Sequence, residues 1–447
     1  MKTLAAKRPG SQLLLGAWFA IGPSLGVVGA VSGSLRNAFL VLVPLIAVGL
    51  ALSVPRGRVA SWGMIDATPA IFAVCSLLLA VLPSPAPTAS GLDLRLLAVT
   101  LIPAIGSYYA IRLTTTSRSD SRYLGRALIG GGAVVLGYAF ILVAVPSAPL
   151  PKAGQTLVKL SGSADGLATT FGNPAASGTF AAVLFLFALS RAVSTHVPAV
   201  RIRFGLLAAA SALVTALSLQ RGAYVALLAG LVVVAWSQMR IRKGILLAAL
   251  SVGLVVATPL GSQIPVSQGV IQRLENQTTI QERVTMNEYS LATMWKYPLT
   301  GTGFSSFDTA KGTVSLALSG PFSPTYYTKG FAKMASHNTF LTVGSEQGVA
   351  TLLLMLLALG LPTLRSIQLL RRSAGSDNWV GVASSASVVA IVAAASTFEL
   401  RYFPWLWSLP WALAALSMSA TQAQSRVATA SASRSVAERP RRSVVPQ

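Results

Sequence analysis

Long apolar segments, more than any motif, constrain the fold of this chain. A helix satisfies its own backbone hydrogen bonds, and about 20 apolar residues in a helix cross the roughly 30 Å of bilayer hydrocarbon. Of the 447 residues, 53% are hydrophobic and only 11% are charged. The sequence therefore predicts an all-α integral membrane protein with about twelve transmembrane helices, surrounded by membrane lipids. The apolar runs lie at residues 12–32, 37–54, 67–83, 94–113, 125–146, 173–190, 204–219, 222–237, 244–259, 338–363, 379–398 and 404–420.

The basic residues predict the orientation. The formal net charge is +23, but Lys and Arg recur in short clusters between the apolar runs, so nucleic acid is not an expected partner. Most clusters fall on the side of the N-terminus, and cytoplasmic loops carry an excess of basic residues. We therefore expect a multi-pass protein with both termini in the cytoplasm. Residues 1–420 are predicted to form one membrane domain, and the Ser-, Ala- and Arg-rich residues 421–447 a disordered cytoplasmic tail.

Two outer segments are long enough to hold structure of their own. Residues 147–172 carry no feature to which a role can be assigned, whereas residues 260–336, between the ninth and tenth spans, contain an amphipathic pattern. That pattern predicts a helix over 282–295 that stops before Pro298. Two interpretations remain open: the helix lies along the membrane surface, or it packs against the end of the bundle. In both interpretations, Arg283 lies near the outer interface of the membrane.

His337 lies where this long loop ends and the apolar run 338–363 begins. Imidazole has an unperturbed pKa of about 6.5, so His337 is a candidate general base. The alternative is that it only caps or anchors the helix. Glu346, inside the same run, is costly in lipid, so we expect it to find a polar partner and to brace the helix rather than react.

Two arginines map to the same side of the membrane as His337. Arg221 lies at the tip of the tight hairpin between the seventh and eighth spans, and Arg283 lies in the long outer loop. Alone, such an arginine commonly extends to the lipid headgroups. Together, two guanidinium groups can clamp a diphosphate through multidentate hydrogen bonds that lysine cannot reproduce. Arg401 maps to this side as well, with no assigned role.

Several short motifs around the long loop resemble those of the O-antigen ligase and O-antigen polymerase superfamily of bacterial membrane glycosyltransferases, which includes protein O-oligosaccharyltransferases. The resemblance covers roughly residues 170–360. Two positions depart from the family pattern, because Gln220 stands where serine is usual and Ala175 where a second asparagine is frequent. The motifs are Phe171-Gly172-Asn173-Pro174, Gln220-Arg221-Gly222, Glu282-Arg283, the run from Tyr297 to Phe304, and His337-Asn338 followed by Leu341, Glu346 and Gly348.

The resemblance implies transfer of a glycan from a polyprenyl-diphosphate carrier to a hydroxyl of a glycan, lipid or protein acceptor, at the outer face of the bacterial plasma membrane. Arg221 and Arg283 would bind the diphosphate, and His337 would accept the proton of the attacking hydroxyl, with Asn338 and Glu346 in supporting roles. Single displacement would invert the anomeric carbon. No cofactor and no metal are expected, since the outer acidic residues lack ligand-like spacing.

Three alternatives stay open at this stage. A polymerase that joins lipid-linked repeat units needs the same diphosphate clamp and the same base. A peptidoglycan polymerase also uses lipid diphosphates, although the acidic catalytic loop of that class is not evident. A polysaccharide transporter or flippase is disfavoured, because the predicted spans are nearly free of charge.

Overall fold

The computed structural model describes residues 10–25, 32–53, 63–82, 94–145, 166–237, 277–307, 337–372 and 378–437. Every regular element within these ranges is a helix, which confirms the all-α class. The elements are α1 (Gly10–Ile21), η1 (Gly22–Ser24), α3 (Gly33–Leu52), α4 (Met64–Val81), α5 (Leu94–Thr114), α6 (Arg118–Ala144), α7 (Pro174–Ser194), α8 (Pro198–Leu217), α9 (Arg221–Ser237), α13 (Gln277–Lys296), α15 (Thr339–Arg372), α16 (Trp379–Ala395), η6 (Leu400–Tyr402) and α17 (Pro404–Ala437).

Among the described residues, seven helices are long and apolar enough to cross a membrane: α3, α4, α5, α6, α7, α8 and α15. Helices α9 and α16 are apolar but shorter. Of the remaining predicted spans, 12–32 overlaps the 12-residue α1, 404–420 is the first half of α17, and 244–259 lies outside the described residues. Several apolar helices thus support a multi-pass membrane protein, while the count of about twelve stays a prediction.

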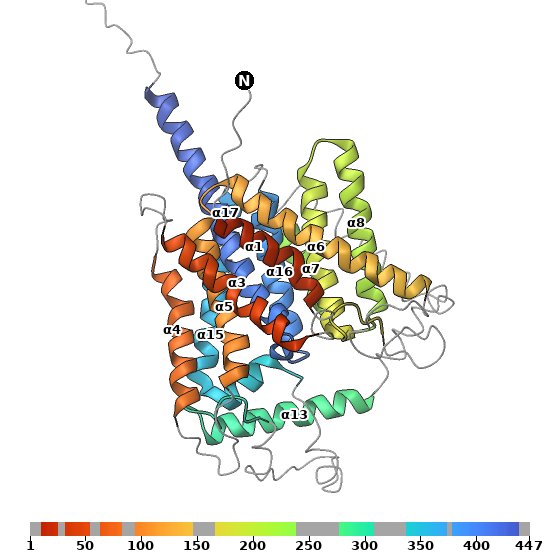
Figure 1. The fold of residues 1–447 in the computed structure, drawn as a ribbon, viewed down its shortest axis with the longest axis vertical. Coiled ribbons are helices and arrows are strands. Elements are labelled where there is room, and N and C mark those ends of the chain that lie inside the picture. Colours follow the sequence, from red (N-terminus) through yellow and green to blue (C-terminus); the bar gives the residue numbers. More distant parts are fainter. Residues whose placement is uncertain are drawn as a thin grey trace, which may run out of the picture.

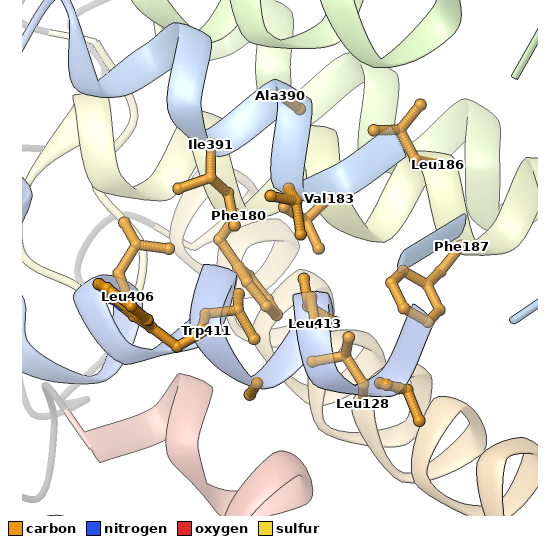
Figure 2. Close-up of a cluster of buried hydrophobic side chains, with 14 of the residues drawn as sticks. Leu128, Phe180, Val183, Leu186, Phe187, Ala390, Ile391, Leu406, Trp411 and Leu413 are labelled. Carbon is orange, nitrogen blue, oxygen red and sulfur yellow. The ribbon is translucent and has the colours of Figure 1, made fainter. Parts of the chain in front are cut away.

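The core forms where α7, α16 and α17 meet. Figure 2 shows Phe180 and Val183 of α7 beside Ile391 of α16 and Trp411 of α17, all buried. The sequence of α16 consists largely of Ala, Ser and Val and is buried on nearly all sides, so its neighbours can approach closely. This centre supports α8 and α9 on one side, while α17 also packs on α5, and α15 on α4.

The last helix is longer than expected. Instead of ending near residue 420, α17 continues to Ala437 and projects beyond the bundle (Figure 1). Helix therefore replaces the predicted disorder over residues 421–437. The composition is compatible with helix because Ala and Gln are strong helix formers, and the start of the extension is packed, with Thr421, Ala423 and Gln424 buried.

One end of the bundle is closed by α13, which lies across it (Figure 1). Phe304, shortly after α13, packs against Ala80 at the end of α4 and Leu97 at the start of α5. The end of α4, the start of α5 and the segment after α13 are thus close together in space. The predicted topology assigned all three to the outer side.

Candidate active site

The backbone of α15 is broken at Gly348, which has φ 80° and ψ 165°. The amide of Val349 therefore does not continue the helical ladder and donates instead to the carbonyl of Pro298, at 2.8 Å. Two glycines four residues apart in an apolar run, as at Gly344 and Gly348, are typical of close packing between helices. At Gly348 the close contact is instead with a loop.

That loop, residues 298–307, is called the docking loop below. Its Thr302 amide donates to the carbonyl of Ser345 and its Gly303 amide to the carbonyl of Glu346, each at 2.9 Å. The loop thus satisfies carbonyl groups that the break removes from the helical ladder. The motif around Gly301 and Gly303 thus has a structural role, namely attachment of the loop to the break in α15.

Two glycines make this attachment sterically feasible. A Cβ atom at Gly348 would overlap the carbonyl of Leu299, and one at Gly301 would overlap the backbone of Glu346. Both glycines also have positive φ, which side chains other than glycine rarely adopt. The docking loop and α15 therefore approach each other backbone to backbone.

Glu346 is buried beside the break and accepts hydrogen bonds from three donors. Its carboxylate accepts from the amides of Ser305 at 3.0 Å and Phe307 at 3.1 Å, and from Arg401 Nη1 at 2.6 Å. Its side chain is 2% exposed. The expectation that Glu346 finds a polar partner is confirmed, and the geometry is that of a brace between three segments.

Arg401 is the partner that sequence reasoning left without a role. Its Nε donates to Glu399 Oε1 at 2.9 Å, so it forms ion pairs with two carboxylates while only 8% of its side chain is exposed. Burial by itself would lower the pKa of the guanidinium, but the charges of Glu346 and Glu399 outweigh burial and hold that pKa above its ordinary value. The guanidinium of Arg401 therefore stays charged, and its ion pair with Glu346 links η6 to α15.

His337 lies two residues before the start of α15 and is half-buried. The side chain of Asn338 accepts from the amides of Phe340 and Leu341, at 3.1 and 3.2 Å, and so caps the helix. Thr339 Oγ1 donates to the carbonyl of Phe398 and accepts from the amide of Leu400, both at 2.9 Å. The residues after His337 are therefore attached to the segment between α16 and η6.

Arg221 is the first residue of α9, after a left-handed Leu219 with φ 52°. Its neighbour Gly222 lies against Thr397, so closely that a Cβ atom would overlap the threonine hydroxyl. Residues 397–401, called the connector below, thus contact the hairpin that carries Arg221 and also the helix start that carries His337. The residues next to Arg221 and those next to His337 therefore contact the same short segment of the chain.

Arg283 lies on α13, which attaches to α15 further along its length. Met294 lies over Gly344, where an added Cβ atom would come within 2.8 Å of the methionine, and Tyr289 packs edge-on against Phe307 of the docking loop. Arg283 precedes Met294 by about three helical turns, roughly 16 Å along the axis. The contacts of α13 place its C-terminal half on α15 and the docking loop, and Arg283 on the half that leads away from them.

The predicted helix is confirmed, and its packing on the end of the bundle is observed, while the interpretation that it lies along the membrane surface stays a prediction. Met286, Tyr289 and Thr293 are buried against the bundle, whereas Leu291 and Trp295 are exposed, the tryptophan to 84%. The helix therefore packs on the end of the bundle and keeps an exposed apolar face as well.

Asn173 behaves as a helix cap. Its side chain accepts from the amides of Ala175 and Ala176, and Pro174 occupies the first helical position of α7. This motif needs no chemical role.

The connector is the part of the site that sequence reasoning missed. The available signal was Glu399 and Arg401 at a two-residue spacing between two apolar runs, a position where buried charges require partners. Among the described residues, no group of three or more His, Cys, Asp or Glu side chains is arranged to bind a metal ion.

Residues 206–356 match the family model described as O-antigen ligase. The matched region begins in α8 and ends within α15, so it contains Arg221, Arg283, His337 and Glu346. This match confirms the family that the motifs predicted. No curated protein sequence matches the chain.

Proposed function

We propose, from the membership of residues 206–356 in the O-antigen ligase family, that this protein is a metal-independent inverting glycosyltransferase. The donor is a glycan linked to polyprenyl diphosphate, and the acceptor is a hydroxyl of a glycan, lipid or protein. The observation that supports a single site most directly is the connector, since the segments that carry Arg221 and His337 both contact it.

In the proposed reaction, the acceptor oxygen attacks the anomeric carbon while an imidazole nitrogen of His337 takes the hydroxyl proton. The bond between the anomeric carbon and the phosphate oxygen breaks, and polyprenyl diphosphate leaves with the electron pair. One displacement inverts the configuration. Negative charge grows on the diphosphate as the bond breaks, so the leaving group needs electrostatic stabilisation rather than a proton donor.

Arg221 and Arg283 supply that stabilisation in the proposal. Planar guanidinium groups donate several hydrogen bonds to phosphate oxygens and stay charged at all relevant pH values. Arg221 has the further advantage of its position at the start of α9, because the N-terminus of a helix favours anions. Arg283 reaches the diphosphate from α13.

The proposed location follows from the predicted topology. The site belongs to the outer face of the bacterial plasma membrane, where lipid-linked glycans are consumed, and both termini belong to the cytoplasm. Asn338 supports His337 by capping α15, and Glu346 supports it by holding the docking loop.

The test is glycan transfer by the full-length protein in liposomes that contain a lipid-linked glycan and an acceptor. We expect His337→Ala, Arg221→Ala and Arg283→Ala each to lower the transfer rate by about 10² or more, the scale of losing a general base or a charge-stabilising group. Two exposed residues outside the proposed site provide matched controls, His196→Ala and Arg203→Ala. Both controls should transfer at the normal rate.

The products also identify the reaction class. A ligase variant that has lost activity accumulates full-length chains on the lipid carrier, whereas a polymerase variant accumulates single repeat units. Normal transfer by all three site variants would refute the proposal and would favour a transporter or flippase.

A further inference from the structure

We propose that the Arg401–Glu346 ion pair is a positioning element of the transferase site, which locks the docking loop and the connector onto the broken part of α15. This inference rests on the proposed function. It assigns no chemistry to either residue and states that the pair sets the relative placement of the segments that carry the reacting groups.

Both carboxylate oxygens of Glu346 are engaged by the protein itself. Oε2 accepts from the amide of Ser305 and from Arg401, and Oε1 accepts from the amide of Phe307, in a site from which solvent is almost excluded. A general base needs access to the substrate hydroxyl. The burial of Glu346 and its ion pair with Arg401 therefore favour a role in holding structure.

Glu346 also maintains an uncommon backbone conformation in the docking loop. Ser305 has φ 60°, a left-handed conformation that residues other than glycine adopt rarely and under strain. Its amide is one of the two that Glu346 binds, and the other belongs to Phe307. Such a conformation persists only where its surroundings enforce it. Glu346 thus fixes the shape of the docking loop.

The docking loop and the connector lead to the segments that carry the predicted site residues. The connector contacts the hairpin of Arg221 through Thr397 and the start of α15, next to His337, through Thr339. The docking loop contacts the C-terminal half of α13 through the ring of Phe307, whereas Arg283 lies on the other half of that helix. The ion pair therefore bears most directly on the placement of Arg221 and His337. A misplacement of about 1 Å at a reacting centre can cost roughly 10² in rate.

A second buried ion pair in the same protein offers a matched control. Arg112 Nε donates to Asp66 Oδ1 at 2.7 Å, and both side chains are almost fully buried. Arg112 also donates to Ser419 and Gln422 of α17. Ser419 lies roughly 22 Å along α17 from its start next to η6. This pair ties α4 and α5 to α17 without contact to the docking loop or the connector.

The first experiment compares Arg401→Lys and Glu346→Gln with Arg112→Lys. Lysine keeps the charge, but its single ammonium group cannot reproduce the geometry of a guanidinium between two carboxylates. We expect the two site variants to lower kcat by about 10-fold to 10²-fold while the KM for the donor changes much less. Arg112→Lys should lower the unfolding temperature about as much as Arg401→Lys does, because each change weakens one buried ion pair. It should leave the kcat of the folded protein unchanged.

The second experiment needs no activity. Cys75 is the single cysteine, so a Cys75→Ala background allows one new thiol to be followed. Ser306 is fully buried in the docking loop and makes a good reporter as Ser306→Cys. We expect slow labelling by a membrane-impermeant maleimide, and labelling at least about 10-fold faster when Glu346→Gln or Arg401→Lys is added, because local opening of the loop exposes the thiol.

The outcomes separate the two proposals. If the unmodified protein transfers no glycan, the proposed function fails and the positioning role in it fails too. If the unmodified protein is active and both site variants keep normal kcat and slow labelling, the positioning role alone is overturned. If Arg112→Lys lowers kcat as much as Arg401→Lys does, the effect is general destabilisation and the inference is again overturned.

Discussion

At the scale of single residues, Gly348 has the most specific requirement in the site. Its positive φ interrupts α15, and its missing side chain lets the backbone of Leu299 pass directly over it. The same helix contains Gly360, around which nothing lies within 4 Å of an added Cβ atom. The two glycines therefore separate the effect of the break from the general effect of adding a methyl group to this helix.

We predict that Gly348→Ala destabilises the protein by about 2 kcal/mol or more, because it combines a strained backbone conformation with a steric clash. Glycan transfer should fall with it, since the docking loop loses its place on α15. Gly360→Ala should be neutral or slightly stabilising, as expected for alanine in a helix. Thermal unfolding in detergent and transfer in liposomes measure the two effects. Equal unfolding temperatures for both variants would contradict this account.

At the scale of elements, α13 presents an apolar face that the protein leaves uncovered. Trp295 and Leu291 are exposed on it, while the opposite face packs on α15 and the docking loop. An exposed apolar face of a helix next to a membrane span is typical of helices that lie in the interfacial region of a bilayer. Tryptophan is also the residue enriched at that depth.

We predict that a nitroxide attached at position 295, in the Cys75→Ala background, is accessible to oxygen and protected from a water-soluble nickel complex. A label at Lys296, which is exposed about 100° further around the same helix, should show the opposite preference. Power-saturation measurements in liposomes give both accessibilities. If both labels are readily accessible to the nickel complex, neither position is in lipid, and this face of α13 does not contact the membrane.

Some features of the site can be predicted from the sequence and others cannot, and the distinction depends on how far apart in the chain the interacting residues are. The caps at Asn173 and Asn338 and the end of α13 before Pro298 depend on neighbours within a few residues, so local patterns can predict them. The Glu346–Arg401 pair joins residues that are far apart in the chain, and no spacing rule connects them. The break at Gly348 was equally hidden, because glycine in an apolar run also occurs where helices pack closely.

At the scale of the whole molecule, the supply of charges at the proposed site is cationic. The hairpin on the connector contributes Arg221, the connector itself contributes Arg401, and the two carboxylates there are already bound to Arg401. Divalent cations prefer several oxygen ligands, especially carboxylates. Because both carboxylates are engaged by Arg401, the proposal assigns the neutralisation of the diphosphate to arginine.

We therefore predict that removal of divalent cations by a chelator leaves the transfer rate within about 2-fold of its normal value. The reaction should be run with and without added Mg²⁺ after the liposomes have been washed in chelator on both sides. A loss of about 10-fold or more that Mg²⁺ restores would show that a cation contributes to the leaving group. The arginine variants would then act in addition to a metal rather than in place of it.

The orientation of the whole molecule in the membrane decides whether the proposed site can reach its donor, because the site must face the compartment that holds the donor. Thr300, in the docking loop, and His196, between α7 and α8, are both exposed, and the predicted topology assigns them to opposite sides of the membrane. In the Cys75→Ala background, we expect an impermeant maleimide to label Thr300→Cys in intact cells and His196→Cys only after the membrane is opened. The reverse pattern would put the docking loop in the cytoplasm. A transferase that acts at the outer face would then be excluded, while the ion pair and the loop that it holds would remain as described.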